Sequence, residues 1–107
     1  MIREATRSDL IAFYGRLPPM TVRALVSVSS DNEPRGVAGY YLKGAVAVAF
    51  SNQKTTPVRE AVEGAKAVVD MLRRLGVEVF AGADGDGRVL RHFGFAPYAD
   101  DVWRLTK

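Results

Sequence analysis

The sequence predicts an α/β fold in which a mixed β-sheet packs against helices within one domain, residues 1–107. The chain has 107 residues, which suits a single domain but not two. A long segment from Pro57 onwards repeats its apolar residues with the 3.6-residue period of a helix, and strand-like segments precede and follow it. A connection of that length joins parallel strands, whereas the short connections elsewhere favour hairpins.

The composition indicates a folded domain and excludes several kinds of site. Hydrophobic residues make up 48% of the chain and charged residues 25%, as in ordinary globular proteins. Because the chain has no cysteine, disulfides, thiolate metal sites and cysteine nucleophiles are excluded. The longest apolar run, residues 45–50, is much shorter than the ~20 residues of a membrane span. Asp9 interrupts the N-terminal apolar residues before a signal peptide can develop. We therefore expect a cytoplasmic protein with no membrane partner.

The charge is mildly basic, with a formal net charge of +3. Basic residues are spread along the chain, and no run exceeds the pair Arg73-Arg74. A nucleic-acid surface usually shows a clustered basic patch or stripe. We therefore expect no nucleic-acid partner, and small anionic ligands suit the charge at least as well.

The elements follow the order β-α-β-β-β-α-β-α-β. Thr6 or Ser8 can cap the first helix, and Gly15 with Pro18-Pro19 ends it. Lys43-Gly44 suits a tight turn between the third and fourth strands. The predicted strands are residues 1–5, 23–29, 36–42, 45–51, 77–81 and 102–105, and the predicted helices are residues 9–16, 57–75 and 88–93.

The long helix is the best specified element. Thr56 suits its N-cap and Pro57 its first helical position, and Gly76 follows its last apolar residue. The centre of the apolar stripe predicts that three side chains are buried: Val62, Val69 and Leu72.

This order of elements, with three short motifs, resembles the GCN5-related N-acetyltransferase (GNAT) family over essentially the whole chain. Residues 2–10 look like the family's first strand and helix start, and Gly36-Val37-Ala38-Gly39 looks like the strand in which the family often carries a Val-Gly step. Residues 88–95 look like the family's closing helix, with Phe93-Gly94-Phe95 at its end. The resemblance implies a GNAT-like acyl-CoA N-acyltransferase fold.

The resemblance also implies where acetyl-CoA binds. In the family it lies between two splayed parallel strands, here residues 45–51 and 77–81. Its pyrophosphate binds N–H groups at the start of the long helix through a Gln/Arg-x-x-Gly-x-Gly/Ala loop, which falls on residues 56–61 of this chain. Arg59 replaces the middle glycine, so its guanidinium either crowds the phosphates or contacts them. The implied cofactor-binding residues are Phe50, Ser51, Asn52, Thr56, Val58, Arg59, Glu60 and Ala61.

Catalytic residues are less defined. Leu90 stands where family members often carry a tyrosine acid, and residues 45–50 contain no carboxylate. The remaining candidates are Glu78, Tyr40 and Tyr41, each on a predicted strand. We expect His92 to be a surface residue. We expect Asp84 and Asp86 to form a turn rather than a calcium site, since the acidic residues are few, and we expect no metal.

Two functions follow from the sequence. The first is an acetyl-CoA-dependent N-acetyltransferase acting on an unidentified amine, with acceptor specificity residing in the loop 16–20. The second is a non-catalytic GNAT-fold module with a structural or partner-binding role, similar to small phage-encoded proteins that include virion-associated ones. An open start of the long helix favours the enzyme, and an Arg59 side chain plugging it favours the module. Self-association is left open, since Trp103 suits either the core or a subunit interface.

Overall fold

A computed structural model describes residues 1–82 and 87–106 of the chain. The elements lie close to the predicted ranges, with boundaries shifted by one or two residues. In chain order they are β1 (Ile2–Glu4), α1 (Arg7–Tyr14), β2 (Val22–Val28), β3 (Pro34–Lys43), β4 (Val46–Gln53), α2 (Val58–Leu75), β5 (Glu78–Gly82), α3 (Arg88–His92), β6 (Phe95–Ala99) and β7 (Val102–Leu105).

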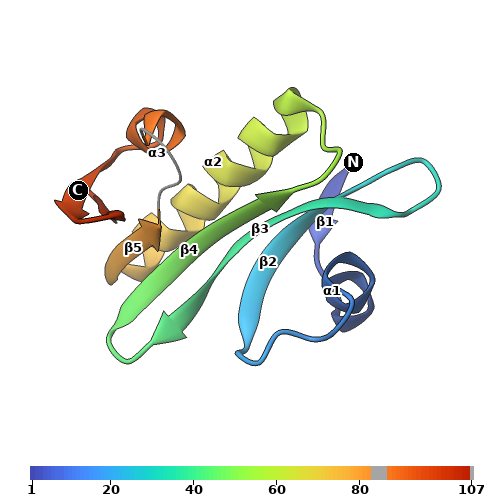
Figure 1. The fold of residues 1–107 in the computed structure, drawn as a ribbon, viewed down its shortest axis with the longest axis horizontal. Helices are drawn as coiled ribbons and strands as arrows, with labels where there is room; N and C mark the ends of the chain where they lie inside the picture. The colour runs from blue at the N-terminus through green and yellow to red at the C-terminus, as the bar shows by residue number, and fades with distance from the viewer. Residues whose placement is uncertain (83–86, 107) are drawn as a thin grey trace.

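The strands form one mixed sheet in the order β1-β2-β3-β4-β5-β7-β6 (Figure 1). Strands β2, β3 and β4 make an antiparallel meander, as their short connections predict. Strand β4 then pairs in parallel with β5, from Val46↔Glu78 to Ala49↔Ala81. The predicted crossover through the long helix is therefore confirmed, and the apolar strand β4 is the middle strand of the sheet.

Two local predictions are wrong. Residues 95–99, which are not among the predicted strands, form the separate strand β6, which pairs antiparallel with β7. The hairpin keeps strand pairing although Pro97 lacks an N–H, because β6 is the edge strand of the sheet. The turn between β3 and β4 consists of Gly44 and Ala45 rather than Lys43 and Gly44, since Lys43 pairs with Val46. Gly44 has a φ of 61°, a value that favours glycine.

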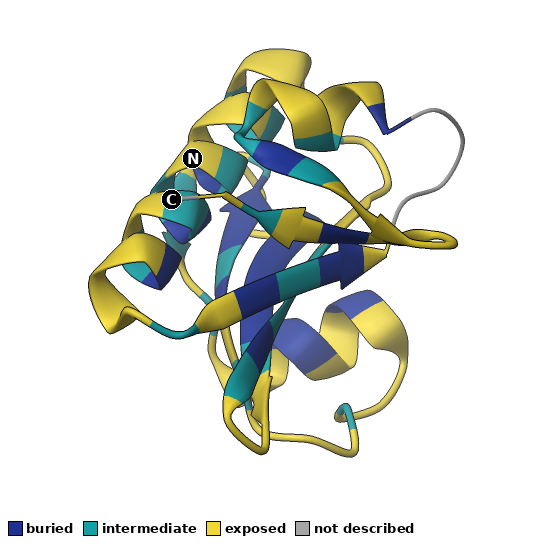
Figure 2. Cartoon of the chain, turned by 90° about the vertical axis from the view of Figure 1, so that its left-hand side faces the viewer, coloured by how far each residue is buried: buried dark blue, intermediate teal, exposed yellow. Residues whose placement is uncertain are grey.

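Helices α1 and α2 cover opposite faces of the sheet, so the protein has two apolar cores (Figure 2). On the α1 face, Leu10 and Phe13 pack against β2 and β3. On the α2 face, Val68 and Leu72 pack against apolar side chains of the central and C-terminal strands. The buried side chains of this second core on the strands are Ala38, Tyr40, Ala47, Val79, Ala81, Phe95 and Trp103.

Helix α2 presents a narrower buried face than its apolar stripe suggests. Leu72 is fully buried and Val69 is half-buried, but Val62 is 43% exposed, so the prediction for Val62 is wrong. Val62 precedes the buried Val68 by six residues, which at roughly 100° per residue places it about 120° away around the helix. The apolar stripe is thus wider than the surface that the sheet covers.

Helix α1 is attached to β1 by polar contacts. Thr6 is the N-cap and forms a capping box with Asp9. The guanidinium of Arg3 donates to both carboxylate oxygens of Asp9, at 2.5 and 2.9 Å. These contacts, chiefly that of Arg3, lower the pKa of Asp9 to about 2. Helix α1 ends at Gly15, whose φ of 83° stops the helix before the loop that leads to β2.

The described part of the chain has neither a helix that could span a membrane nor a cluster of metal-ligating side chains. None of the helices in the described ranges is long and apolar enough to cross a membrane. The described residues also contain no group of three or more metal-ligating side chains. Asp84 and Asp86 lie outside the described residues.

Candidate functional site

Strand β4 extends beyond its parallel partner at one end. Its pairing with β5 stops at Ala49↔Ala81, whereas its pairing with β3 continues to Gln53↔Gly36. On the β5 side, residues 50–53 therefore have no strand partner within the described ranges. Three of the predicted cofactor-binding residues, Phe50, Ser51 and Asn52, lie in this stretch. Because side chains alternate along a strand, Phe50 and Asn52 share one face and Ser51 points to the other.

The start of α2 lies directly after this free edge, and no side chain caps it. Pro57 is the N-cap residue, so the prediction that Thr56 caps the helix is wrong by one position. The N–H of Ala61 donates to Pro57 O at 3.0 Å and is not free for a ligand. The unbonded N–H groups of the first turn are therefore those of Val58, Arg59 and Glu60.

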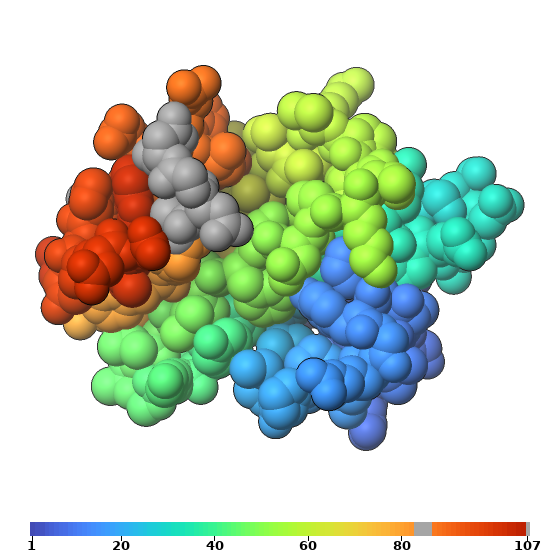
Figure 3. All heavy atoms as spheres, in the orientation of Figure 1, coloured from blue at the N-terminus to red at the C-terminus, as the bar shows by residue number. Residues whose placement is uncertain are grey.

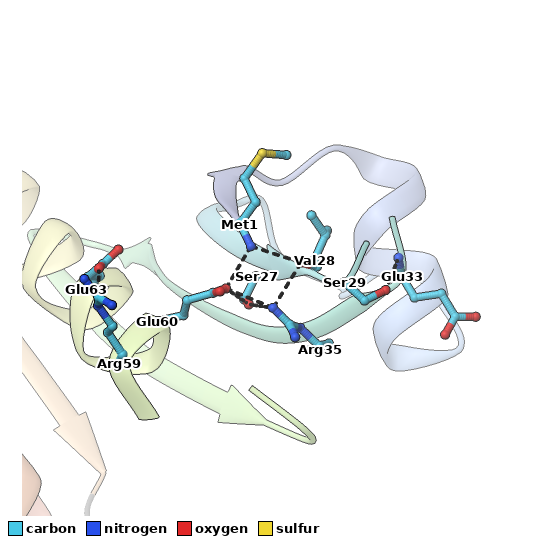
Figure 4. A network of polar contacts seen from close by, with 9 residues as sticks. All are labelled: Met1, Ser27, Val28, Ser29, Glu33, Arg35, Arg59, Glu60 and Glu63. Atoms are coloured by element: carbon cyan, nitrogen blue, oxygen red, sulfur yellow. Dashed lines mark hydrogen bonds and ion pairs between the residues drawn. The ribbon is translucent and has the colours of Figure 1, made fainter. Parts of the chain in front are cut away.

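Arg59 does not cover the start of α2. Its side chain is 91% exposed, and its Nε lies 3.9 Å from Glu63 Oε1, one turn further along the helix. Figure 4 shows Arg59 and Glu63 together on one side of α2, while Glu60 points the other way, toward the sheet. Of the two positions considered for Arg59, the structure shows the outward one.

Thr56 and Gly36 fit tightly together beneath the loop before α2. A Cβ on Gly36 would lie 2.0 Å from Thr56 Oγ1 and 1.9 Å from Gln53 Oε1. Thr56 Oγ1 is itself buried, with no hydrogen-bond partner in the described part of the chain. The absence of a side chain at Gly36 therefore allows this loop to pack onto β3.

Glu60 joins the first turn of α2 to β2 and β3 (Figure 4). Its Oε1 accepts from Ser27 Oγ at 2.5 Å, from the Met1 ammonium at 3.0 Å and from Arg35 at 3.1 Å. The Ser27 hydroxyl first, and then the Met1 ammonium, lower the pKa of Glu60 to about 2. The carboxylate is thus ionised at neutral pH, and nearby cations offset its charge beside the helix start.

A groove of about 340 Å³ opens on the α1 face next to the free end of β4. We call it the α1 groove. Figure 3 shows this face, with the N-terminal segment in blue beside β4 in green. Its polar residues are Tyr14, Arg16 and Asn52, and its other lining residues are Pro18, Pro19, Met20, Val22, Tyr41 and Phe50. Phe50 and Asn52 therefore belong to both the groove and the free edge of β4.

Two polar side chains of the α1 groove, those of Tyr14 and Asn52, are hydrogen-bonded to each other. Asn52 Nδ2 donates to the Tyr14 hydroxyl oxygen at 2.9 Å, so the Tyr14 hydroxyl hydrogen and Asn52 Oδ1 remain free to bind a ligand. Burial raises the pKa of Tyr14, which keeps the phenol protonated. The Arg16 guanidinium is exposed, and no partner for it is found among the described residues.

The structure separates the three catalytic candidates. Tyr41 lines the α1 groove, but Tyr40 is 6% exposed and belongs to the core on the α2 face. Glu78 begins β5, at the end of the parallel pair remote from residues 50–53, and its carboxylate lies 3.4 Å from Arg104. His92 is exposed on α3. Only Tyr41 therefore shares a site with the predicted cofactor strand.

Sequence reasoning placed acceptor recognition in the loop 16–20 but missed Tyr14. Tyr14 ends α1 and follows Phe13, whose ring is buried under the sheet. The two rings pack edge to face, with centroids 4.9 Å apart. An aromatic residue directly before a helix-ending Gly and a Pro-Pro pair was the available signal.

Comparison with known proteins gives matches in structure alone. No family model and no curated protein sequence matches the chain. A proposed acyl-CoA N-acyltransferase from Klebsiella pneumoniae is similar, with a TM-score of 0.61 and 18% identity over 99% of this chain and 97% of that one. A GNAT-family acetyltransferase from Staphylococcus aureus has a TM-score of 0.56 and 10% identity over 95% of this chain and 81% of that one. The chain therefore has the GNAT acyl-CoA N-acyltransferase fold over nearly its whole length.

Proposed function

We propose that this protein is an acetyl-CoA-dependent N-acetyltransferase that acts on a small amine. One observation carries the proposal: β4 and β5 stop pairing after Ala49↔Ala81, beside an uncapped start of α2, in a chain with the GNAT fold. A free strand edge offers backbone groups to the amides of pantetheine. A helix start offers N–H groups and about half a positive charge to a pyrophosphate.

The residues at this end of the sheet suit acetyl-CoA in most respects. The amides of Val58, Arg59 and Glu60 would hold the pyrophosphate, and the backbone of residues 50–52 would hold the pantetheine arm. Arg59 leaves the helix start open and carries a cation near it. The carboxylate of Glu60 opposes an anion, but Arg35 and Met1 offset its charge.

When bound, acetyl-CoA supplies an activated thioester carbonyl. The amine nitrogen forms a C–N bond with the carbonyl carbon, and the C–S bond breaks with its electron pair on sulfur. Nitrogen loses one proton and the thiolate gains one, so the reaction needs no other reactant. No carboxylate or imidazole lines the α1 groove in the described ranges. We therefore propose that the protein positions the two reactants and that solvent accepts the proton of the amine.

Calorimetry with acetyl-CoA and with CoA tests the proposal. Wild-type protein should bind both ligands. Arg59→Glu should weaken binding roughly tenfold, about 1.4 kcal/mol, because an anion replaces a cation in the first turn. Glu in the first turn favours the helix itself, so folding should be preserved.

Lys66→Glu is the matched control. Lys66 is also exposed on α2, and the substitution makes the same change in net charge well beyond the first turn. It should leave the affinity within about twofold, since the helix dipole acts within one turn. Equal losses in the two variants would indicate a general charge effect rather than a site.

The second candidate is the non-catalytic GNAT-fold module, with a structural or partner-binding role of the kind expected among phage-encoded proteins. The observations that favour it are the arginine at position 59 in place of the family's glycine and, within the described ranges, the lack of a carboxylate or imidazole in the α1 groove. If calorimetry detects no binding of acetyl-CoA or CoA by the wild type or by Arg59→Gly, the non-catalytic module is the better account.

A further inference from the structure

We propose that the acceptor is a primary amine that also carries a carboxylate and a large apolar side chain, that is, a free α-amino acid such as phenylalanine. This inference rests on the proposed acetyl transfer and names its substrate class. It follows from the charges and surfaces of the α1 groove.

The charge of the groove selects against polycationic amines. Its lining includes one cation, Arg16, and no carboxylate within the described ranges. Lys54 adds a second cation close by, since its Nζ lies 4.3 Å from the ring centroid of Phe13 and donates to Phe13 O. A polyamine or a basic peptide would meet like charges here, whereas a carboxylate would pair with the unpartnered Arg16.

The free polar groups suit an amino acid in one orientation. Asn52 lies in the part of β4 that has no partner on the β5 side, and its Oδ1 is available as an acceptor because its Nδ2 donates to Tyr14. An amine donating to Asn52 Oδ1 therefore lies beside the strand that we assign to pantetheine. The carboxylate then extends toward Arg16, at the loop side of the groove.

The rest of the lining suits an apolar side chain. Pro18 and Met20 come from the loop between α1 and β2, whereas Val22, Tyr41 and Phe50 come from strands β2, β3 and β4 of the sheet. A volume of about 340 Å³ lies in the range of small-ligand sites and is too small for a folded protein segment. Apolar side chains from the loop and from the sheet exclude water from a bound aromatic or aliphatic group.

The test compares ligands that differ in one group. The 107-residue chain is titrated with L-phenylalanine, with phenethylamine, which lacks the carboxylate, and with spermidine. Acetylation of each is then followed with acetyl-CoA. L-Phenylalanine should bind at least tenfold more tightly than phenethylamine. Spermidine should neither bind nor be acetylated. Preferential acetylation of spermidine would overturn the inference.

Arg16→Gln isolates the carboxylate contact. It should weaken L-phenylalanine binding roughly tenfold while changing phenethylamine binding less than twofold. Arg7→Gln, on the exposed side of α1, removes an equal charge outside the groove and should change neither affinity. Equal losses for both ligands in Arg16→Gln would also overturn the inference.

The inference and the proposed function fail separately. Acetyl-CoA binding without Arg16-dependent binding of L-phenylalanine would leave the transferase and remove this substrate class. Arg16-dependent binding of L-phenylalanine without any CoA binding would support the groove assignment and refute the transferase.

Discussion

Asp9 and Glu60 both occupy the third position of a helix, yet their carboxylates accept hydrogen bonds from different kinds of partner. Asp9 accepts from the backbone N–H of its own N-cap, Thr6, at 2.8 Å. The N-cap of α2 is Pro57, which has no N–H to offer. Glu60 instead binds Ser27 and Arg35 across the sheet, and the start of α2 stays uncapped. A proline at the cap position thus leaves the helix start available to an anion.

The ion pair of Asp9 predicts acid sensitivity. The pKa of Asp9 is lowered from 3.8 to about 2 in the folded protein, so its contribution to stability is full above about pH 5. That contribution is lost as the pH falls from about 4 to about 2. Asp9→Asn should therefore be less stable than wild type at pH 7, and the difference should shrink at pH 2.5. Urea unfolding at both pH values measures this.

Asp70→Asn is the control for this measurement, because Asp70 is exposed on α2. It should show no such convergence with the wild type. Glu60 titrates in the same acid range, with a pKa also near 2, so Asp9→Asn should retain part of the acid loss. A constant difference between Asp9→Asn and wild type over this range would contradict the pKa argument.

At the scale of an element, α2 is held by a narrow line of contacts. The side chain of Leu72 is fully buried, at 0% relative exposure, whereas Val62 lies at the edge of the contact between the helix and the sheet and is 43% exposed. Leu72→Ala should destabilise the protein by ~2–5 kcal/mol, because it leaves a cavity between the helix and the sheet. Val62→Ala should cost less than about 1 kcal/mol, since a half-exposed side chain loses little contact.

Chemical denaturation of the two α2 variants compares these costs directly. Both substitutions install alanine in the same helix, and the gain in helix propensity is larger for Val62→Ala, because valine is a poorer helix former than leucine, which lowers the cost of that variant further. A loss below about 1 kcal/mol for Leu72→Ala, or equal losses for the two, would mean that α2 packs differently.

At the scale of the whole molecule, the topology assembles a site from segments far apart in the chain. Strand β4 and helix α2 supply the proposed cofactor end, and the α1–β2 segment supplies the groove beside it. The catalytic candidate Glu78 lies at the opposite end of the parallel pair, and the imidazole of His92 lies on α3. The fold therefore positions reactants and supplies no evident proton acceptor from the described residues.

The rate of transfer should consequently follow the ionisation of the amine. Below the pKa of the acceptor amine, kcat/KM should rise about tenfold per pH unit, because the neutral fraction of the amine rises by that factor. An acceptor with a lower amine pKa should shift the profile by the same amount. His92→Gln and Glu78→Gln should keep kcat/KM within about twofold.

A pH–rate inflection that stays in place when the acceptor is changed would contradict this prediction. It would assign the proton to a group of the protein. Tyr41→Phe is then the first variant to measure, since Tyr41 is the catalytic candidate that lines the α1 groove.

The sequence alone determined the order of the main elements, the meander and the parallel crossover, because hydrophobic period and connection length are local properties of the chain. Through resemblance rather than through periodicity, it also predicted a cofactor site at residues 50–52 and the start of α2, and that assignment stays a prediction. Tertiary structure decided which part of the apolar stripe is buried, so that Leu72 is covered and Val62 is not. It also decided that Arg59 points outward to Glu63, and that Tyr14 and Asn52, 38 residues apart, share a hydrogen bond. These outcomes depend on how the helices lie on the sheet. The hydrophobic period of one segment does not say how far that segment lies from any other segment in the folded chain.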